Sequence, residues 1–144
     1  MSPRDIENVI LFQLDKTNKI AKQHSQVEMD RHGMGITVEQ WVLLKIIEES
    51  DQLSQKDLAI QSLRDPASIT RTLDILSKKK LIRREALPEN RRQYHILLTQ
   101  EGKNFVKKHM RLVHQLRAQS IAGFSTQELE QLSSYLKRMQ ENMS

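Results

Sequence analysis

The sequence has 144 residues, enough for one ordinary domain with its own hydrophobic core but too few for two independent domains. It has no cysteine, no long apolar run and no apolar stretch behind a basic N-terminus, which excludes disulfides, thiolate metal ligands, a membrane span and a signal peptide. Low glycine, proline and aromatic contents predict a mainly α fold, and the net charge of +5 favours an anionic partner.

The N-terminal part of the chain predicts two helices. Apolar side chains recur at helical spacing over residues 6–29, and Gly33 and Gly35 end this long helix. Thr37 and Gln40 form a capping-box pair that starts the next helix. Apolar residues recur at helical spacing in that second helix, at Trp41, Leu44 and Ile47.

The centre of the chain predicts a helix-turn-helix. Ser54 caps a short helix, and Asp65 followed by Pro66 is the strongest helix start in the sequence, for a helix that runs to about Lys79. This helix has an apolar face at Ile69, Leu73 and Leu76. The opposite face carries Ala67, Arg71, Asp74 and Lys78, flanked by Ser68 and Thr70. Small polar residues with a basic residue one turn later suit a helix that enters the major groove of DNA.

A basic hairpin follows this helix. Residues 81–86 and 94–98 predict two short strands, joined by turn residues 87–90, and make the helix-turn-helix a winged one. Four arginines crowd the hairpin, at Arg83, Arg84, Arg91 and Arg92. Their mutual repulsion costs stability unless a polyanion offsets it, so we expect the hairpin to enter a minor groove.

Two helices complete the predicted fold. Thr99 caps a long helix that ends at Gly123, and Ser125 with Glu128 forms a second capping box. The last helix carries an apolar seam with alternating spacings of three and four, at Leu129, Leu132, Leu136, Met139 and Met143. Such a seam requires a partner, so we expect the chain ends to be association surfaces.

The surplus positive charge lies entirely in residues 64–95. This segment holds nine basic and four acidic residues, whereas the rest of the chain holds 14 of each. A local cationic face on an otherwise neutral protein is typical of an anion-binding surface, and nucleic-acid phosphates are its commonest large target. Two alternatives stay open, because Arg71, Asp74 and Lys78 could pair along a solvated helix and a charged hairpin could keep a sheet edge soluble.

Enzymatic chemistry has little support in the sequence. His109 and His114 point in different directions from a helix and the other histidines are scattered, so no metal site is expected. The sequence also lacks a cysteine nucleophile, a glycine-flanked serine elbow and a phosphate-cradling glycine loop. We therefore expect neither an enzyme nor a bound cofactor.

Three stretches, in the right order, resemble the MarR family of bacterial transcription regulators. They are residues 35–44 at the start of the second helix, residues 65–76 as recognition helix, and residues 90–99 followed by Glu101 and Gly102 after the wing. The resemblance covers nearly the whole chain. This chain departs from similar members at Lys80, where they have Gly, and at Asn90, where they have Asp. Lys80 therefore has to adopt or avoid a left-handed conformation, which bears on the angle between recognition helix and wing.

The resemblance implies a mainly α winged helix-turn-helix with a small β-hairpin, which dimerises through N- and C-terminal helices. Within one folding unit, we expect an N-terminal dimerisation helix (1–36), a DNA-binding lobe (37–99) and C-terminal dimerisation helices (100–144). Major-groove residues, backbone contacts and the wing arginines together give the expected DNA-binding set: Ser54, Gln55, Ala67, Ser68, Thr70, Arg71, Lys78, Arg83, Arg84, Arg91 and Arg92.

The sequence therefore predicts a homodimeric regulator of the bacterial cytoplasm, expected to be a repressor, that binds a pseudo-palindromic operator in double-stranded DNA. By resemblance, a small aromatic or anionic effector could release the DNA. The alternative is a winged-helix adaptor whose basic hairpin docks on an acidic protein. Salt-dependent and sequence-selective binding of duplex DNA distinguishes the regulator from the adaptor.

Overall fold

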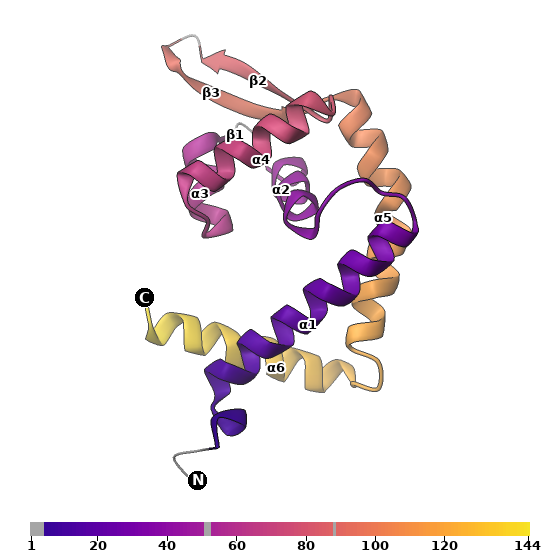
Figure 1. The fold of residues 1–144 in the computed structure, drawn as a ribbon. Helices are drawn as coiled ribbons and strands as arrows, with labels where there is room; N and C mark the ends of the chain where they lie inside the picture. Colours follow the sequence, from indigo (N-terminus) through magenta and orange to yellow (C-terminus); the bar gives the residue numbers. More distant parts are fainter. Residues whose placement is uncertain (1–4, 51–52, 88) are drawn as a thin grey trace. The chain divides into compact units, whose positions relative to one another are not determined.

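The computed structural model describes residues 5–50, 53–87 and 89–144. The chain divides into two compact units, residues 1–112 and residues 113–144. The first unit holds the helix-turn-helix and the sheet, and the second holds the C-terminal helix. Figure 1 shows the order of the elements along the chain.

The first predicted helix is present but begins later than its apolar pattern indicates. A 3-10 helix, η1 (Ile6–Asn8), comes first, and the extended backbone of Val9 separates it from α1 (Ile10–Arg31). Gly33 and Gly35 follow α1 with φ values of 67° and 72°, in the left-handed region that glycine enters without steric cost. The predicted end of the first helix is therefore confirmed.

The second helix, α2 (Val38–Glu48), starts at the predicted capping box. The backbone N–H of Gln40 donates to Thr37 Oγ1 at 3.1 Å, and the N–H of Thr37 donates to Gln40 Oε1 at 3.0 Å. Two orphan donors of the first turn are satisfied in this way. The predicted apolar residues of α2 are buried, namely Trp41, Leu44 and Ile47.

The helix-turn-helix consists of α3 (Gln55–Ser62) and α4 (Pro66–Lys78). Ser54 caps α3 as predicted, in a capping box with Asp57. Asp65 caps α4, and its side chain accepts the backbone N–H of the third helical residue at 2.9 Å. The predicted apolar face of α4 is completely buried at Ile69, Leu73 and Leu76.

The sheet has three antiparallel strands in the order β1 (Leu53–Ser54), β3 (Asn90–Leu98), β2 (Ile82–Leu87). The predicted hairpin is confirmed, but β3 begins at Asn90 rather than Tyr94, because backbone pairing with β2 continues past the apolar stretch to the Leu87–Asn90 pair. Strand β1 was not predicted, since two residues are too few to show alternation. Pro88 of the predicted turn lies outside the described residues.

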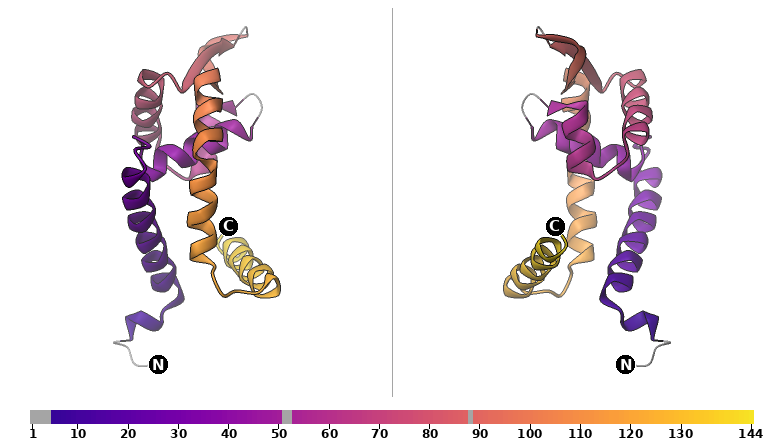
Figure 2. Two further views of the ribbon diagram at one scale, coloured as in Figure 1. Left: turned by 90° about the vertical axis from the view of Figure 1, so that its right-hand side faces the viewer. Right: turned by 90° about the vertical axis from the view of Figure 1, so that its left-hand side faces the viewer.

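The hairpin formed by β2 and β3 extends past the helices of the first unit, as Figure 2 shows from two sides. Its base is anchored in the core, where Ile82, Ile96 and Leu98 are buried. The hairpin therefore has a fixed base and a projecting end, which is the shape that a wing requires.

The connection from α4 to β2 contains a left-handed lysine. Lys80 has a φ of 62°, which L residues adopt at a steric cost. The backbone N–H of Leu81 donates to Leu76 O at 3.0 Å, and that of Lys80 donates to Ser77 O at 2.9 Å. These two bonds form a Schellman motif, in which glycine is the usual left-handed residue. Lys80 thus adopts the left-handed conformation instead of avoiding it.

The start of α5 (Gln100–Ser120) packs closely against the same connection. Thr99 caps this helix as predicted, with its Oγ1 accepting from Gly102 N–H at 2.9 Å and donating to Lys80 O at 2.6 Å. A Cβ added to Gly102 would lie 2.0 Å from the carbonyl oxygen of Leu81, so only glycine fits this position. The first turn of α5 therefore fixes the place where α4 ends and the wing begins.

The second unit contains the end of α5, a turn at Gly123 with a φ of 87°, and α6 (Thr126–Asn142). Ser125 and Glu128 form the predicted capping box. No residue of α6 is buried, so its apolar seam is left at least partly exposed within one chain. No helix within the described ranges is long and apolar enough to cross a membrane.

The substitution Lys80→Gly is expected to stabilise the protein by about 1 kcal/mol, because glycine removes the steric cost of the left-handed conformation. Lys79→Gly is the matched control, since Lys79 has a φ of −78° and gains nothing from glycine there. Urea unfolding of both variants measures the free energies of unfolding. A Lys80→Gly protein that is no more stable than wild type, or a Lys79→Gly protein that gains as much, would contradict the assignment.

Candidate nucleic-acid interface

The face of α4 opposite the core carries the predicted major-groove residues. Ala67, Thr70 and Arg71 are exposed, and Ser68 is half-buried. Lys78, the last residue of the helix, is exposed. No ion pair of the described residues involves Arg71 or Lys78. The face therefore offers hydroxyl groups near its N-terminal end and two cations that form no ion pair with the part of the chain that the structure describes.

Two predicted residues from different helices meet at the N-terminal end of α4. Gln55 Nε2 of α3 donates to Thr70 Oγ1 at 2.8 Å, and Thr70 Oγ1 donates to Pro66 O at 3.0 Å. The contact fixes the amide of Gln55 beside the helix that would read bases. Ser54 lies next to Gln55, but its hydroxyl accepts from Asp57 N–H and serves the cap of α3.

The carboxyl of Asp57 stays ionised at the start of α3. Hydrogen bonds from the Ser54 side chain and then from its backbone N–H lower the pKa of Asp57, and the nearby Lys56 and His95 add to this effect. An ionised carboxylate in the first turn interacts favourably with the positive end of the helix dipole and so strengthens the cap. The local structure of α3 therefore holds at neutral pH.

An ion pair joins the recognition helix to the wing. Arg84 Nη2 of β2 donates to Asp74 Oδ1 of α4 at 2.9 Å. The acidic side chain of the α4 face thus pairs across to the hairpin rather than along its own helix with Arg71 or Lys78. This disagrees with the alternative of a solvated helix whose charges pair among themselves, and it assigns Arg84 a structural contact.

The other described wing arginine remains on the surface. Arg83 Nη1 lies 3.0 Å from Glu85 Oε1 on the same strand, and both side chains are about half exposed. The side chains of Arg91 and Arg92 lie outside the described residues, although their backbone belongs to β3. The wing therefore presents Arg83 to solvent, while Arg84 is committed to α4.

A groove of about 870 Å³ lies between α3 and the hairpin. Its lining includes residues outside the predicted set, among them Lys56 of α3 and Tyr94 and His95 of β3. Strand β1 brings them together, because Ser54 pairs with His95 across the sheet. Since β1 has only two residues, no sequence pattern indicated this neighbourhood. The groove reaches the N-terminal end of α4, because Pro66 is also part of its lining.

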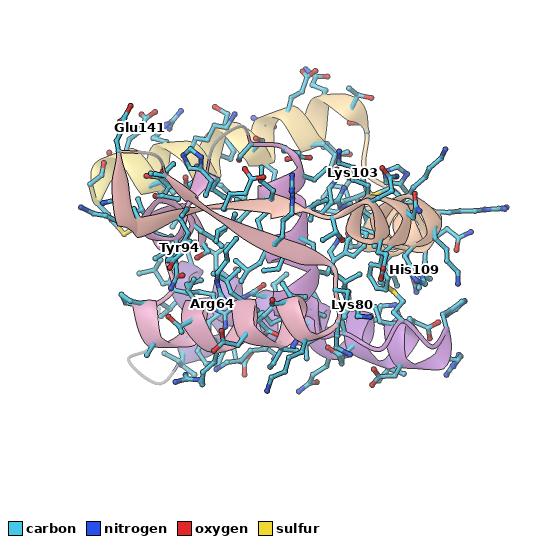
Figure 3. The ribbon with its side chains drawn as sticks, turned by 90° about the horizontal axis from the view of Figure 1, so that it is seen from above. Arg64, Lys80, Tyr94, Lys103, His109 and Glu141 are labelled. Atoms are coloured by element: carbon cyan, nitrogen blue, oxygen red, sulfur yellow. The ribbon has the colours of Figure 1, made fainter. Side chains whose placement is uncertain are left out.

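Arg64 is the other residue whose position the sequence did not reveal. It immediately precedes the cap of α4 and is half-buried, and its Nη2 donates to the hydroxyls of Ser68 and Thr72. Figure 3 shows Arg64 and Lys80 at opposite ends of α4, with Tyr94 on the neighbouring hairpin. In the sequence Arg64 contributes only to the count of positive charge, and burial of a charged side chain has no pattern of its own.

The surface formed by α4, the start of α3 and the hairpin is called here the basic face. It offers hydroxyl, amide and guanidinium donors, which recognise phosphates and base edges. No cluster of three or more His, Asp or Glu side chains in the described part of the chain could hold a metal ion.

Comparison with known proteins shows similarity to transcription regulators and a shared fold. Residues 36–94, which include the helix-turn-helix and most of the hairpin, match the MarR family model. The HTH-type transcriptional regulator YdgJ of Bacillus subtilis (strain 168) is 28% identical over 138 residues, which cover 96% of this chain and 81% of YdgJ.

Solved structures agree over nearly the whole chain. A probable transcriptional regulator from Pseudomonas aeruginosa has a TM-score of 0.79 and 26% identity, covering 93% of this chain and 98% of that protein. The MepR–DNA complex of S. aureus has a TM-score of 0.83 and 23% identity, and the match covers 94% of this chain and 98% of the MepR chain. The second likeness, at this identity, shows the fold alone.

The Asp74–Arg84 pair is expected to contribute a coupling free energy of about 0.5 kcal/mol to stability, because solvent screens its partly exposed charges. A double-mutant cycle of Asp74→Ala and Arg84→Ala, followed by urea unfolding, measures it. The Arg83–Glu85 pair is the control, because both residues belong to β2 and Arg83 is more exposed than Arg84. Its coupling free energy should be smaller. A coupling of zero for the first pair would remove the proposed link between helix and wing.

Proposed function

We propose that this chain is a member of the MarR family and a sequence-specific regulator that binds a pseudo-palindromic operator in double-stranded DNA as a homodimer. The match of residues 36–94 to the MarR family model and the similarity to YdgJ support this proposal. The observation that carries the proposal is the arrangement of α4. Its apolar stripe is fully buried, so its hydroxyls and Arg71 are held on the opposite face, beside an arginine-bearing hairpin. The proposed sign of regulation is repression.

Different side chains of the basic face would contact different parts of the DNA. Ser68, Thr70 and Arg71, near the N-terminal end of α4, are proposed to read base edges in the major groove. Lys78 and Arg83 are exposed cations suited to phosphate contacts. Arg91 and Arg92 of the hairpin are proposed for the minor groove. Ala67 is small enough to let the backbone of α4 approach the bases.

Homodimerisation is supported by the exposed apolar side chains near both chain ends. Ile10 and Leu11 of α1, and Leu132 and Tyr135 of α6, expose about half of their area in one chain. Exposed apolar surface on this scale favours association. Two lobes related by a two-fold axis would meet successive major grooves roughly 34 Å apart, which matches a pseudo-palindromic site.

We also propose that a small aromatic or anionic effector releases the DNA. An aromatic cluster in the first unit supports this idea: the ring centroids of Trp41 and Phe105 are 6.5 Å apart, and those of Phe105 and His109 are 4.5 Å apart. Trp41 Nε1 is buried and has no acceptor among the described residues. Burial, and secondarily Lys108, lower the pKa of His109, so a neutral imidazole faces Phe105 at neutral pH.

The proposal includes no enzymatic step, in line with the regulator family that the chain matches. A regulator of this kind acts where the chromosome lies, so we propose the bacterial cytoplasm as its location. The adaptor hypothesis, in which the hairpin docks on an acidic protein, requires weak DNA binding without sequence preference and is separated by the same binding experiment.

Arg71→Ala is expected to reduce binding of a selected duplex by about tenfold or more while changing binding of random duplex much less, because a base contact is lost. Arg83→Ala should weaken both and lower the slope of log affinity against log salt by about one unit, because a phosphate contact is lost. Fluorescence anisotropy with both duplexes at several salt concentrations measures these effects. Equal loss on both duplexes for Arg71→Ala would contradict its role in base reading.

Hydroxybenzoic acids are expected to raise the melting temperature of the free protein and to weaken its binding to the selected duplex. The matched variant is Trp41→Phe, which keeps an aromatic ring but removes the indole N–H, and it should respond less. Thermal-shift and anisotropy titrations with the same compounds test both effects. If no compound of this class changes both quantities, the effector proposal fails for that class.

A further inference from the structure

Arg64 holds two hydroxyl groups of the recognition helix from within the lobe. Its side chain is half-buried, and Nη2 donates to Ser68 Oγ and, at 3.2 Å, to Thr72 Oγ1. Ser68 and Thr72 are one helical turn apart on α4, and Thr72 is 6% exposed. One guanidinium nitrogen thus bridges a core-facing hydroxyl and the hydroxyl that we propose for base reading.

The second terminal nitrogen of the guanidinium, Nη1, shows that burying Arg64 costs folding free energy. Arg64 Nη1 is buried and has no hydrogen-bond partner among the described residues. A buried charged group with an unsatisfied donor destabilises a protein relative to an apolar side chain of similar size. Stability alone therefore does not account for an arginine at this position.

A carboxylate of α2, that of Glu39, interacts electrostatically with the guanidinium of Arg64. Burial alone would raise the pKa of Glu39, but its backbone hydrogen bond, Lys22 and the charge of Arg64 together lower it. Lys22 Nζ of α1 lies 3.1 Å from Glu39 Oε1 of α2. The carboxylate of Glu39 is therefore ionised and paired with Lys22, and its attraction for Arg64 is weaker than that for Lys22.

We propose that Arg64 is a specificity-determining positioning residue, which acts through the hydroxyl of Ser68 and does not itself contact DNA. The inference rests on the proposed function and deepens it. Because Ser68 Oγ accepts a hydrogen bond from Arg64, its hydroxyl hydrogen is left to point elsewhere. Thr72 differs, since its hydroxyl hydrogen is used in a bond of 3.0 Å to Ser68 O.

The hydrogen bond from Arg64 gives the hydroxyl of Ser68 a preference for hydrogen-bond acceptors in the major groove. A hydroxyl that already accepts from Arg64 has used one of its two lone pairs and keeps its hydrogen, so donation to DNA is favoured over a second acceptance. Purine N7, guanine O6 and thymine O4 are acceptors in that groove, whereas cytosine presents the N4 donor. Ser68 therefore selects against cytosine at the base it contacts, once in each half-site.

The test uses the full chain and a duplex that the wild-type protein enriches from a random pool. Affinities are measured for the selected duplex and for every single base-pair change in one half-site. Arg64→Met keeps a side chain of similar length but removes its donors. It is expected to reduce discrimination against cytosine by about fivefold at one position, the same position that Ser68→Ala affects. The double variant Arg64→Met/Ser68→Ala should lose no more than Ser68→Ala alone.

Arg83→Met is the matched control, because it removes the same charge from an exposed site. It should lower affinity on every duplex and reduce the salt slope by about one unit, whereas Arg64→Met should leave the slope unchanged. The melting temperature separates a merely structural role, because Arg64→Met is expected to keep or raise it while discrimination falls.

The outcomes are distinct. Loss of discrimination at the Ser68 position with an unchanged salt slope and an undiminished melting temperature supports the inference. An unchanged base profile, a uniform loss of affinity on all duplexes, or additive effects in the double variant overturns it while leaving the proposed function intact. If the wild-type protein enriches no duplex sequence, the proposed function fails, and the inference fails with it.

Discussion

Burial of one stripe of α4 is the constraint on which the rest of the structure depends. Ile69, Leu73 and Leu76 are completely buried, and this fixes the rotation of the helix about its own axis. Once the rotation is fixed, Arg71 must face outwards and the hydroxyls of the first turns must lie along its flank. The tight contact of Gly102 with the α4–β2 connection then fixes where the wing starts. The basic face is thus a consequence of core packing.

The arginines of residues 64–95 have different roles, although the sequence counts them as equal charges. Arg71 and Arg83 expose their guanidinium groups, whereas Arg84 is paired with Asp74 and ties the wing to α4. Arg64 is drawn inwards, where it holds hydroxyls of the recognition helix. Only part of the positive charge of this segment is therefore exposed to solvent. The remainder contacts side chains of α4, the helix that we propose to read bases.

The sequence predicted what depends on local chemistry. Caps at Thr37, Ser54 and Asp65 were found because their side chains bond to backbone a few residues away. Non-local pairing was not predictable: β1 is too short for any pattern, and the extension of β3 to Asn90 depends on its partner strand. The burial of Arg64 was also missed, since its surroundings on α2 and α4 exist only after these helices have packed. The roles of the DNA-binding residues stay predictions.

The central claim is that two α4 helices enter successive major grooves of one duplex while the wings occupy the neighbouring minor grooves. Methylation protection tests it most directly, because dimethyl sulfate modifies guanine N7 in the major groove and adenine N3 in the minor groove. On the selected duplex the account predicts two patches of protected N7 atoms, roughly ten base pairs apart on one side of the helix, flanked by protected N3 atoms. Full methylation of both atoms under saturating protein, or protection confined to a single groove, would contradict it.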